Sequence, residues 1–423
     1  MDSTGWKAAA AAVVITPTEP MWLAGWAARR QPGTAKSMDL FAKALALEDE
    51  RGERVVIVTA DLIAIPRALA NAVAARVQQR WSLPRARILF NASHTHTGPE
   101  IRPDKVPFFE IPPEFAAKIG PYVGRLEGNI SGVIDEALGR LEPATLHAFR
   151  GDVAFAHNRR HAGGPTDHAV PALMVNRRED GKPRALLFGY ACHNLTLPPA
   201  FVAYHGDYAG VAQARLEQKF PGVVALFLAG AGADQDPAPR GNLELAQAHG
   251  TALADAVQAA GTAEEVSATL GVAFEEVALD LQPVPWPETL QADARSDDAP
   301  RRRKAEFLLA ALAARQPLPS SLDCPVQVIR LGEEFLIIAL GGEPVVEYGL
   351  RFKSELTGRL VCVAGYSNDM FGYLPTRRVQ EEGGYEGGRA VLWSALPAPV
   401  SESSEERVFA AVRRMAAELD APS

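Results

Sequence analysis

Cysteine and histidine are scarce in this sequence, and there is no concentration of positive charge. The 423 residues include three cysteines and nine histidines, and the formal net charge is −8. Cys192, Cys324 and Cys362 are too widely spaced for a CxxC site, which disfavours a disulfide framework and a cysteine-based zinc site. An acidic chain without a basic face is not typical of nucleic-acid binders. We therefore expect no nucleic-acid partner.

Long apolar runs are also missing. No stretch approaches the ~20 apolar residues of a membrane-spanning helix, so we expect no integral membrane segment. The short run Ala8–Ile15 follows a single lysine and lacks a small-residue cleavage site, which favours a first β-strand over a signal peptide. The expected location is cytoplasmic as the sequence stands, and periplasmic or secreted if a leader has been trimmed. The sequence carries no indication of oligomeric state.

Short apolar runs alternate with amphipathic helical stretches along the chain. Val55–Thr59, Ala185–Cys192 and Phe335–Leu340 are continuously apolar, which is typical of strands covered on both faces. This pattern predicts an α/β fold, with a mixed and mostly buried β-sheet flanked by helices.

One proline-rich, acidic stretch interrupts the pattern. Pro283–Pro300 is predicted to be an exposed excursion, and the basic run Arg301–Lys304 behind it to be a solvated helix face. It does not separate two cores, so we expect a single catalytic domain over residues 1–423.

Polar side chains follow six predicted strands at the points where those strands end. Because ligand sites in open α/β sheets form beside the carboxyl ends of strands, we expect a shared pocket there. The residues at these ends are Asp61, Asn91, Ser93, His94, His96, His193, Asn194, Asp234, Asp236, Glu343, Asn368 and Asp369.

The chemistry of this pocket points to a metal. His94 and His96 are two residues apart in HTHTGP, which places both imidazoles on one face of an extended segment. With His193 and Glu343 they offer a His/His/Glu set, a recurring arrangement for catalytic zinc with water as a further ligand. Asp61, Asp207 and Asp234 are candidates to orient the imidazoles. The HxH pair alone is a weak signal, since a single histidine is more often a hydrogen-bonded loop residue.

Two other chemistries remain open at this point. Ser93 has neighbouring histidines but no GxSxG elbow, so a Ser93-dependent esterase or lactonase is the alternative enzyme. A non-catalytic protein that binds an acyl ligand or a glycan is the other alternative. The segment Gly230–Asp234 lacks the third glycine of a dinucleotide loop and the lysine of a P-loop, which disfavours phosphate binding.

Several motifs together resemble the neutral, or alkaline non-lysosomal, ceramidases and their bacterial relatives. The resemblance implies a zinc-dependent hydrolase that cuts an amide carbon–nitrogen bond of a small molecule with a metal-activated water. Its motifs extend over nearly the whole chain in the family's order, and they are NASHTHTGP, AHNRR, YACHNLTL, HGDYAG, GAGADQDP, LGGEPV, SNDMFGYLPT and GGYEGG.

The resemblance also implies roles for individual residues. The implied zinc ligands are His94, His193, Glu343 and Tyr373, with Tyr366 as the alternative if the register of the last motif differs. The implied catalytic groups around the reacting carbonyl are His96, Tyr385 and Arg159.

The sequence departs from its relatives in ways that bear on the substrate. Those relatives carry a C-terminal immunoglobulin-like domain, which we do not expect here. Ceramide therefore becomes a weaker candidate than a smaller N-acyl amide. Apolar residues beside the motifs are the candidate walls of an acyl site, among them Trp22, Phe109 and Phe371. We expect short or medium apolar acyl chains to be preferred over long-chain ceramide.

Overall fold

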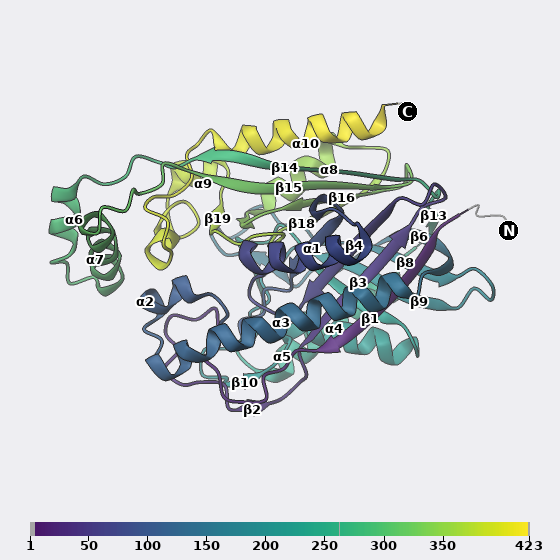
Figure 1. The fold of residues 1–423 in the computed structure, drawn as a ribbon, viewed down its shortest axis with the longest axis horizontal. Helices are drawn as coiled ribbons and strands as arrows, with labels where there is room; N and C mark the ends of the chain where they lie inside the picture. Colours follow the sequence, from purple (N-terminus) through teal and green to yellow (C-terminus); the bar gives the residue numbers. More distant parts are fainter. Residues whose placement is uncertain (1–4, 262, 422–423) are drawn as a thin grey trace.

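Two β-sheets pack face to face, and helices cover the outer face of each sheet (Figure 1). The computed structural model describes residues 5–261 and 263–421. Strands in such an arrangement have apolar neighbours on both faces, which explains their continuous apolar runs. The predicted α/β class with buried mixed sheets is confirmed, although the strands form two stacked sheets.

The larger sheet runs in the order β11-β9-β8-β6-β1-β3-β4-β5, with β13 pairing β6. The pairs β4–β5 and β9–β11 are parallel, and the other pairs of this sheet are antiparallel. Its strands are β1 Lys7–Val14, β3 Phe41–Glu48, β4 Arg54–Ala60, β5 Ile88–Ala92, β6 Glu142–Asp152, β8 Ala169–Arg177, β9 Pro183–Tyr190, β11 Val224–Ala229 and β13 Glu264–Glu265.

The smaller sheet has the order β14-β15-β16-β18, in which only β16 and β18 are parallel neighbours. An apolar layer fills the space between the sheets, with Leu45, Ile57 and Leu187 on one side and Ile329 and Ile337 on the other. The strands are β14 Leu270–Asp280, β15 Ser321–Leu331, β16 Phe335–Leu340 and β18 Leu360–Ala364.

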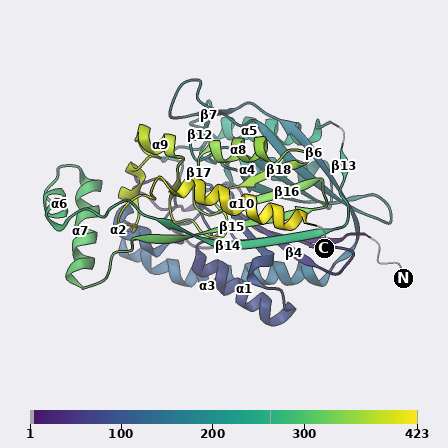
Figure 2. The same cartoon turned by 90° about the horizontal axis from the view of Figure 1, so that it is seen from above.

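Three pairs of helices complete the four layers. The first pair covers the β1–β3–β4–β5 half of the large sheet, the second covers β8, β9 and β11, and the third covers the small sheet. Figure 2 shows α10 lying along β14 and β15. The pairs are α1 Arg67–Trp81 with α3 Pro113–Gly139, α4 Asp207–Lys219 with α5 Leu243–Gln258, and α8 Val346–Glu355 with α10 Ser404–Asp420. No helix in the described part of the chain has the length and apolar character needed to cross a bilayer.

Shorter elements connect these layers. They are β2 Ala35–Lys36, β7 Ala156–Asn158, β10 Ala203–Tyr204, β12 Gln235–Pro237, β17 Glu343–Pro344, β19 Tyr373–Leu374, α2 Val106–Phe109, α9 Arg377–Glu382, and the 3-10 turns η1 Arg85–Arg87, η2 Pro103–Lys105 and η3 Arg389–Trp393.

The predicted excursion forms a helical hairpin between β14 and β15. Its helices α6, Pro287–Asp293, and α7, Ala299–Ala313, extend beyond the sheets, and α7 contacts α2 and η3 (Figure 1). The prediction that the basic run is a solvated face was wrong for Lys304, which is buried and donates to the carbonyl oxygens of Ser394 (2.6 Å) and Leu396. The long lysine side chain reaches these acceptors because α7 packs against the loop that carries them.

A single buried amide joins three strand ends. The Oδ1 of Asn91, on β5, accepts a hydrogen bond from the backbone N–H of Ala229 at the end of β11 (3.0 Å). Its Nδ2 donates to the carbonyl oxygen of Gly365 (2.6 Å) and to Ser367 Oγ (3.0 Å), just after β18. Since β5 and β11 are the two ends of the large sheet's strand order, this tie brings both edges of that sheet to the small sheet.

Replacement of this amide is expected to be costly. Asn91→Ala leaves the buried Ala229 N–H without its partner, at about 1–3 kcal/mol, and removes the hydrogen bonds to Gly365 and Ser367, at about 0.5–1.5 kcal/mol each. We expect the free energy of unfolding, measured by denaturant titration, to fall by about 2–5 kcal/mol. The control is Asn71→Ala, because Asn71 is exposed on α1 and accepts a single bond from Arg85. Equal losses in the two variants would contradict the assigned role of Asn91.

Candidate metal centre

Strand ends from both sheets deliver the predicted ligands to one place. His94 and His96 follow β5, and His193 follows β9. Glu343 lies on β17, directly after β16, and Tyr373 lies on β19, after β18. The four segments therefore meet at the carboxyl ends of their strands, as the sequence predicted.

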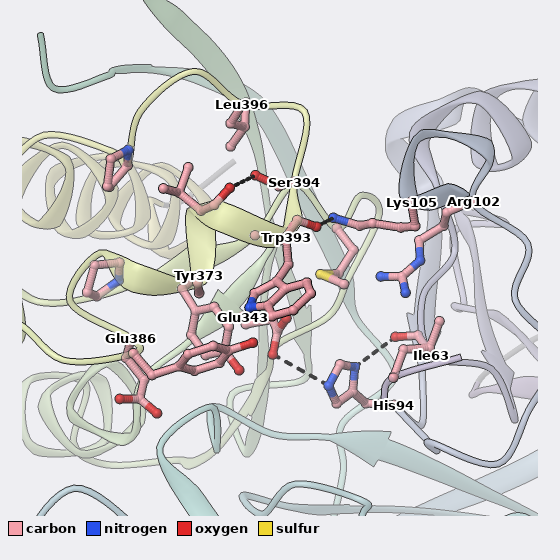
Figure 3. Close-up of a pocket in the computed structure, with 18 of the residues that line it drawn as sticks. Ile63, His94, Arg102, Lys105, Glu343, Tyr373, Glu386, Trp393, Ser394 and Leu396 are labelled. Carbon is pink, nitrogen blue, oxygen red and sulfur yellow. Dashed lines mark hydrogen bonds and ion pairs between the residues drawn. The ribbon is translucent and has the colours of Figure 1, made fainter. Parts of the chain in front are cut away.

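The donor atoms lie close enough to share one cation. The ligand nitrogens of His94, His96 and His193 are within 4.8 Å of one another. Glu343 Oε2 lies 3.4 Å from His94 Nε2 (Figure 3). The same oxygen lies 3.5 Å from His193 Nε2. Ligands held 2.0–2.2 Å from a tetrahedral zinc are separated by about 3.3–3.6 Å. The separations of Glu343 from the two imidazoles match such a set.

Backbone carbonyls orient the two imidazoles that face Glu343. His94 Nδ1 lies 2.8 Å from the carbonyl oxygen of Ile63, and His193 Nδ1 lies 3.1 Å from that of Gly232. An Nδ1–H that donates to a carbonyl leaves the Nε2 lone pair free for a metal. Both Nε2 atoms point toward Glu343 Oε2, which has no hydrogen-bond partner among the described residues.

Carboxylates do not fill this orienting role, so the expectation for the three aspartates is corrected. Each of them accepts hydrogen bonds from backbone or side-chain amide N–H groups within the described chain, and the imidazole Nδ1 atoms of His94 and His193 lie against backbone carbonyls instead. The pairings are Asp61 with Phe41 and Gln213, Asp207 with Leu197 and Tyr208, and Asp234 with Val346 and Asn158.

His96 occupies a different environment from the other two histidines. It is buried, and neither ring nitrogen has a hydrogen-bond partner in the described part of the protein. Its ring packs edge-on against Trp26, with centroids 5.2 Å apart. Gly25 lies so close that a Cβ there would stand 2.4 Å from the His96 ring. A glycine at this position therefore lets the backbone pack against the imidazole without displacing it.

Burial sets the protonation of the cluster. It lowers the pKa of His94 to about 3 and that of His96 well below its usual range, so both imidazoles are neutral at pH 7. Burial also opposes ionisation of Glu343, but the contacts with His94 and His193 and the Arg159 cation outweigh it and lower the pKa to about 2. Neutral imidazoles beside an ionised carboxylate form a donor set that needs no proton loss to bind a cation.

Tyr373 joins the cluster through strand register. Residues 343 and 373 are partners in the parallel β17–β19 pair, which sets the two side chains next to each other. The Tyr373 hydroxyl accepts a hydrogen bond from Arg159 Nη2 at 2.9 Å. Burial raises the pKa of this phenol well above its usual range, and the Arg159 cation works in the opposite direction. Ligation by Tyr373 would therefore rely on the positive charges of Arg159 and the metal.

Tyr366, the alternative candidate ligand, lies against the ring of His94. The Tyr366 ring stacks on His94, with centroids 4.2 Å apart, and its hydroxyl is buried without a partner among the described residues. It therefore supports the ring of a candidate ligand, whereas Tyr373 has the register contact with Glu343.

Arg159 is held by three acidic or phenolic groups. Besides Tyr373, it donates to Glu386 Oε1 at 2.7 Å and to Asp236 Oδ1 at 3.2 Å. Its guanidinium also lies 5.8 Å from the centre of the Tyr385 ring. Because its donors are already engaged, Arg159 is placed to hold Tyr373 and Tyr385 beside the cluster.

The histidines line two cavities that share several of their wall residues. An inner cavity of about 100 Å³ exposes His94 and Glu343, and an outer one of about 1040 Å³ opens toward Arg303 on α7. Both are lined by His96, His193, Phe109, Tyr373, Tyr385 and Trp393.

Of the three candidate substrate-binding residues, one lines these two cavities and two do not. Phe109 lines both cavities. Trp22 is buried in the same apolar cluster as Phe109, with its ring tilted against that of Phe115, and Phe371 packs over Gly342. Neither residue lines these two cavities.

Sequence reasoning missed two cations of the inner cavity. Arg102 and Lys105 follow HTHTGP within a few residues and line this cavity. Their proximity to the histidine motif was the available signal, but two cations in a proline-rich turn are usually solvated. Only the fold shows that they are buried.

Comparisons with known proteins identify the fold. No protein-family model and no curated protein matches the chain. A structure of a ceramidase complexed with C2 superimposes with a TM-score of 0.73 at 18% identity, over 97% of this chain and 76% of that chain. Neutral ceramidase from Pseudomonas aeruginosa superimposes with a TM-score of 0.72 at 19% identity, over 99% and 76% of the two chains. This chain therefore has the neutral ceramidase fold, as the motif resemblance implied.

The donor geometry generates a prediction about metal content. We expect the purified protein to bind one zinc per chain and Glu343→Gln to weaken zinc binding, because an ionised ligand is replaced by a neutral amide. The loss should exceed the roughly 10–100-fold cost of removing a supporting residue. Metal analysis with competitive chelator titration measures it. Glu306→Gln, exposed on α7, is the control. Unchanged zinc affinity in Glu343→Gln would remove Glu343 from the ligand set.

Proposed function

We propose that this chain is a zinc-dependent amidohydrolase that cleaves a linear N-acyl amide, with residues 1–423 acting as one catalytic unit. The observation that carries the proposal is the buried Glu343 Oε2, which has no hydrogen-bond partner among the described residues and faces the Nε2 atoms of His94 and His193. A buried carboxylate that faces two imidazole nitrogens is stabilised by a shared cation. The fold of the neutral ceramidases, established above, agrees with amide hydrolysis.

The residues present fit zinc in both chemistry and spacing. Nitrogen and oxygen donors at these separations suit zinc, and the ligands proposed are His94, His193, Glu343 and Tyr373. Bound zinc would make water nucleophilic at neutral pH and polarise the amide carbonyl. Orienting the substrate and transferring protons fall to side chains of the chain itself.

His96 is the proposed proton carrier. Both of its ring nitrogens lack partners within the described chain, and its ring lines both cavities beside the candidate ligands. Its lowered pKa keeps the imidazole neutral at rest and able to accept the proton that the attacking water loses. His96 then passes this proton to the departing nitrogen, because an amide does not readily expel an unprotonated amine. The products are a carboxylic acid and an amine.

Tyr385 and Arg159 are proposed to stabilise negative charge, Tyr385 on the reacting carbonyl oxygen and Arg159 on the Tyr373 phenol. Partial burial, together with the charge of Glu343, raises the pKa of Tyr385 to about 12, so its hydroxyl remains a hydrogen-bond donor at neutral pH. Such a donor stabilises the negative charge that develops on the carbonyl oxygen. Arg159 acts one step further away, since its hydrogen bond to Tyr373 favours negative charge on that phenol.

The volumes of the two cavities limit the size of the substrate groups that they can hold. The inner cavity, about 100 Å³, is smaller than the ~150 Å³ cavity that holds benzene in an engineered protein core. A long acyl chain does not fit there, whereas a short group does. The larger outer cavity, with Trp26, Phe109 and Trp393 in its walls, has room for the other half of the substrate. We therefore propose small N-acyl amides as substrates and long-chain ceramide as a poor one.

The alternative functions receive less support. Ser93 is buried and lines neither cavity, so its hydroxyl is not placed to attack a substrate there. A non-catalytic binding protein has no need for three histidines and a carboxylate that converge on one point.

Paired histidine variants test the assigned roles. We expect His94→Ala to lose both zinc and activity, because a ligand is removed. His96→Ala should keep most of its zinc while kcat falls by about 10²–10⁴-fold, the usual contribution of a proton-transfer group. Zinc content and amide hydrolysis are measured on the same preparations.

His147→Ala on β6, away from the cavities, is the control and should retain both properties. Equal zinc loss in the His94 and His96 variants would show that His96 is a ligand. Activity that survives complete chelation but disappears in Ser93→Ala would instead establish the serine hydrolase.

A further inference from the structure

Two buried cations form one wall of the inner cavity. Arg102 and Lys105 come from the turn after HTHTGP and reach into the pocket from the same side, with Glu343, Tyr373 and Trp393 beyond them (Figure 3). Their side chains are 6% and 9% exposed. A charged group is rarely buried to this degree unless it is paired with an opposite charge or has a ligand.

The charge of Arg102 is already balanced. Its Nε and Nη2 each donate to the Glu100 carboxylate at 2.7 Å, in a bidentate pair that is almost completely buried. This pairing holds the guanidinium in a fixed orientation at the cavity wall.

Lys105 lacks an equivalent partner. Its ammonium donates to the backbone carbonyl of Trp393 at 3.0 Å, and the nearest carboxylate oxygen among the described residues belongs to Asp104 at 3.8 Å. The Asp104 side chain is half exposed, so it neutralises Lys105 only weakly. An ammonium has three donors, and a single carbonyl leaves two available.

Lys304, on α7, offers a comparison, because it donates to the same loop that accepts the hydrogen bond of Lys105. It is also buried, and it donates to two carbonyl oxygens, those of Ser394 and Leu396. It forms no part of either cavity wall. Lys304 therefore has the partners expected of a lysine that fastens a loop, whereas Lys105 has fewer partners and faces the cavity.

The rest of the inner cavity suits a short spacer. Ile63, Met370 and Leu396 supply apolar parts of the cavity lining, beside the cations and the candidate ligands that line the same cavity. A ligand that fills this space has a reacting carbonyl near His94 and Glu343, a few carbon atoms against the apolar walls, and an anionic end at Lys105.

We propose that Lys105 and Arg102 form an anion subsite that binds a carboxylate on the short half of the amide substrate. This inference rests on the proposed amidohydrolase function for its role in catalysis. The carboxylate belongs either to the acyl half, as in a monoamide of a short dicarboxylic acid, or to the amine half, as in an N-acyl amino acid. In both cases the larger uncharged half occupies the outer cavity.

A binding experiment tests the subsite independently of hydrolysis. Glutarate and its uncharged diamide are titrated by calorimetry against the zinc-free protein. We expect glutarate to bind and the diamide to bind at least 10-fold more weakly. Lys105→Gln should weaken glutarate binding at least 10-fold, whereas Lys105→Arg should weaken it less than 3-fold.

Lys304→Gln is the matched control. It should lower thermal stability without changing glutarate affinity, because Lys304 does not reach the cavity. Equal affinity of the wild-type protein for glutarate and its diamide, or unchanged glutarate binding in a folded Lys105→Gln protein, overturns the proposal.

Hydrolysis of two substrate pairs then identifies the half that carries the charge. Glutaryl anilide and its methyl ester place the charge on the acyl half, and N-phenylacetylglycine and its methyl ester place it on the amine half. In one pair we expect kcat/KM of the zinc-loaded enzyme to favour the carboxylate at least 10-fold, with the preference falling below 3-fold in Lys105→Gln. A preference for the ester in both pairs contradicts the subsite.

The two proposals can fail separately. Lys105-dependent glutarate binding without hydrolysis of any of these amides supports the anion subsite and rejects the amidohydrolase function. Zinc-dependent hydrolysis without carboxylate preference supports the amidohydrolase function and rejects the subsite.

Discussion

The buried amide of Asn91 holds the architecture of the site together. It connects β5 with the ends of β11 and β18, and so joins the two edges of the large sheet to the small sheet. His94 and His96 lie three and five residues beyond Asn91 along the same segment. His193 follows the strand beside β11, and Glu343 follows the strand beside β18. The distances between the candidate ligands therefore depend on a hydrogen-bonded group that touches none of them.

Charge balance is the second constraint on the site. Burial favours neutral histidines, but Glu343 and Arg159 stay ionised in the same region because each has oppositely charged or polar neighbours. Arg159 shares its charge among Glu386, Asp236 and Tyr373, and this network fixes the tyrosine relative to Glu343. Within the inner cavity Lys105 stands out, since the one carboxylate of the described residues within 4 Å of its ammonium is that of Asp104, at 3.8 Å and half exposed.

The helical hairpin between β14 and β15 supplies part of the wall of the outer cavity. Helix α7 packs on α2 and on the loop after η3, and Lys304 fastens it there. Arg303, from the same helix, lines the outer cavity and pairs with Glu110. A hairpin that precedes Glu343 by about thirty residues in the sequence thus contributes Ala299, Pro300 and Arg303 to the wall of the outer cavity.

The sequence by itself determined the class of the fold and the neighbourhood of the site. Continuous apolar runs predicted strands such as β4, β9 and β16, and polar residues directly after strands predicted where the site lies, because both patterns depend on local burial and strand direction. The motif order alone led to the ceramidase resemblance, which the superpositions support at the level of the fold.

Only the tertiary structure decided which residues meet. Glu343 and Tyr373 become neighbours through the β17–β19 register, which brings together segments thirty residues apart in the sequence. The imidazoles are oriented by carbonyls of Ile63 and Gly232, and a backbone acceptor leaves no trace in side-chain identity. The sequence predicted a solvated face at Lys304 and gave no prediction for Lys105, since burial of a long side chain depends on what packs over it. These features arise from contacts between distant segments, and no local pattern encodes them.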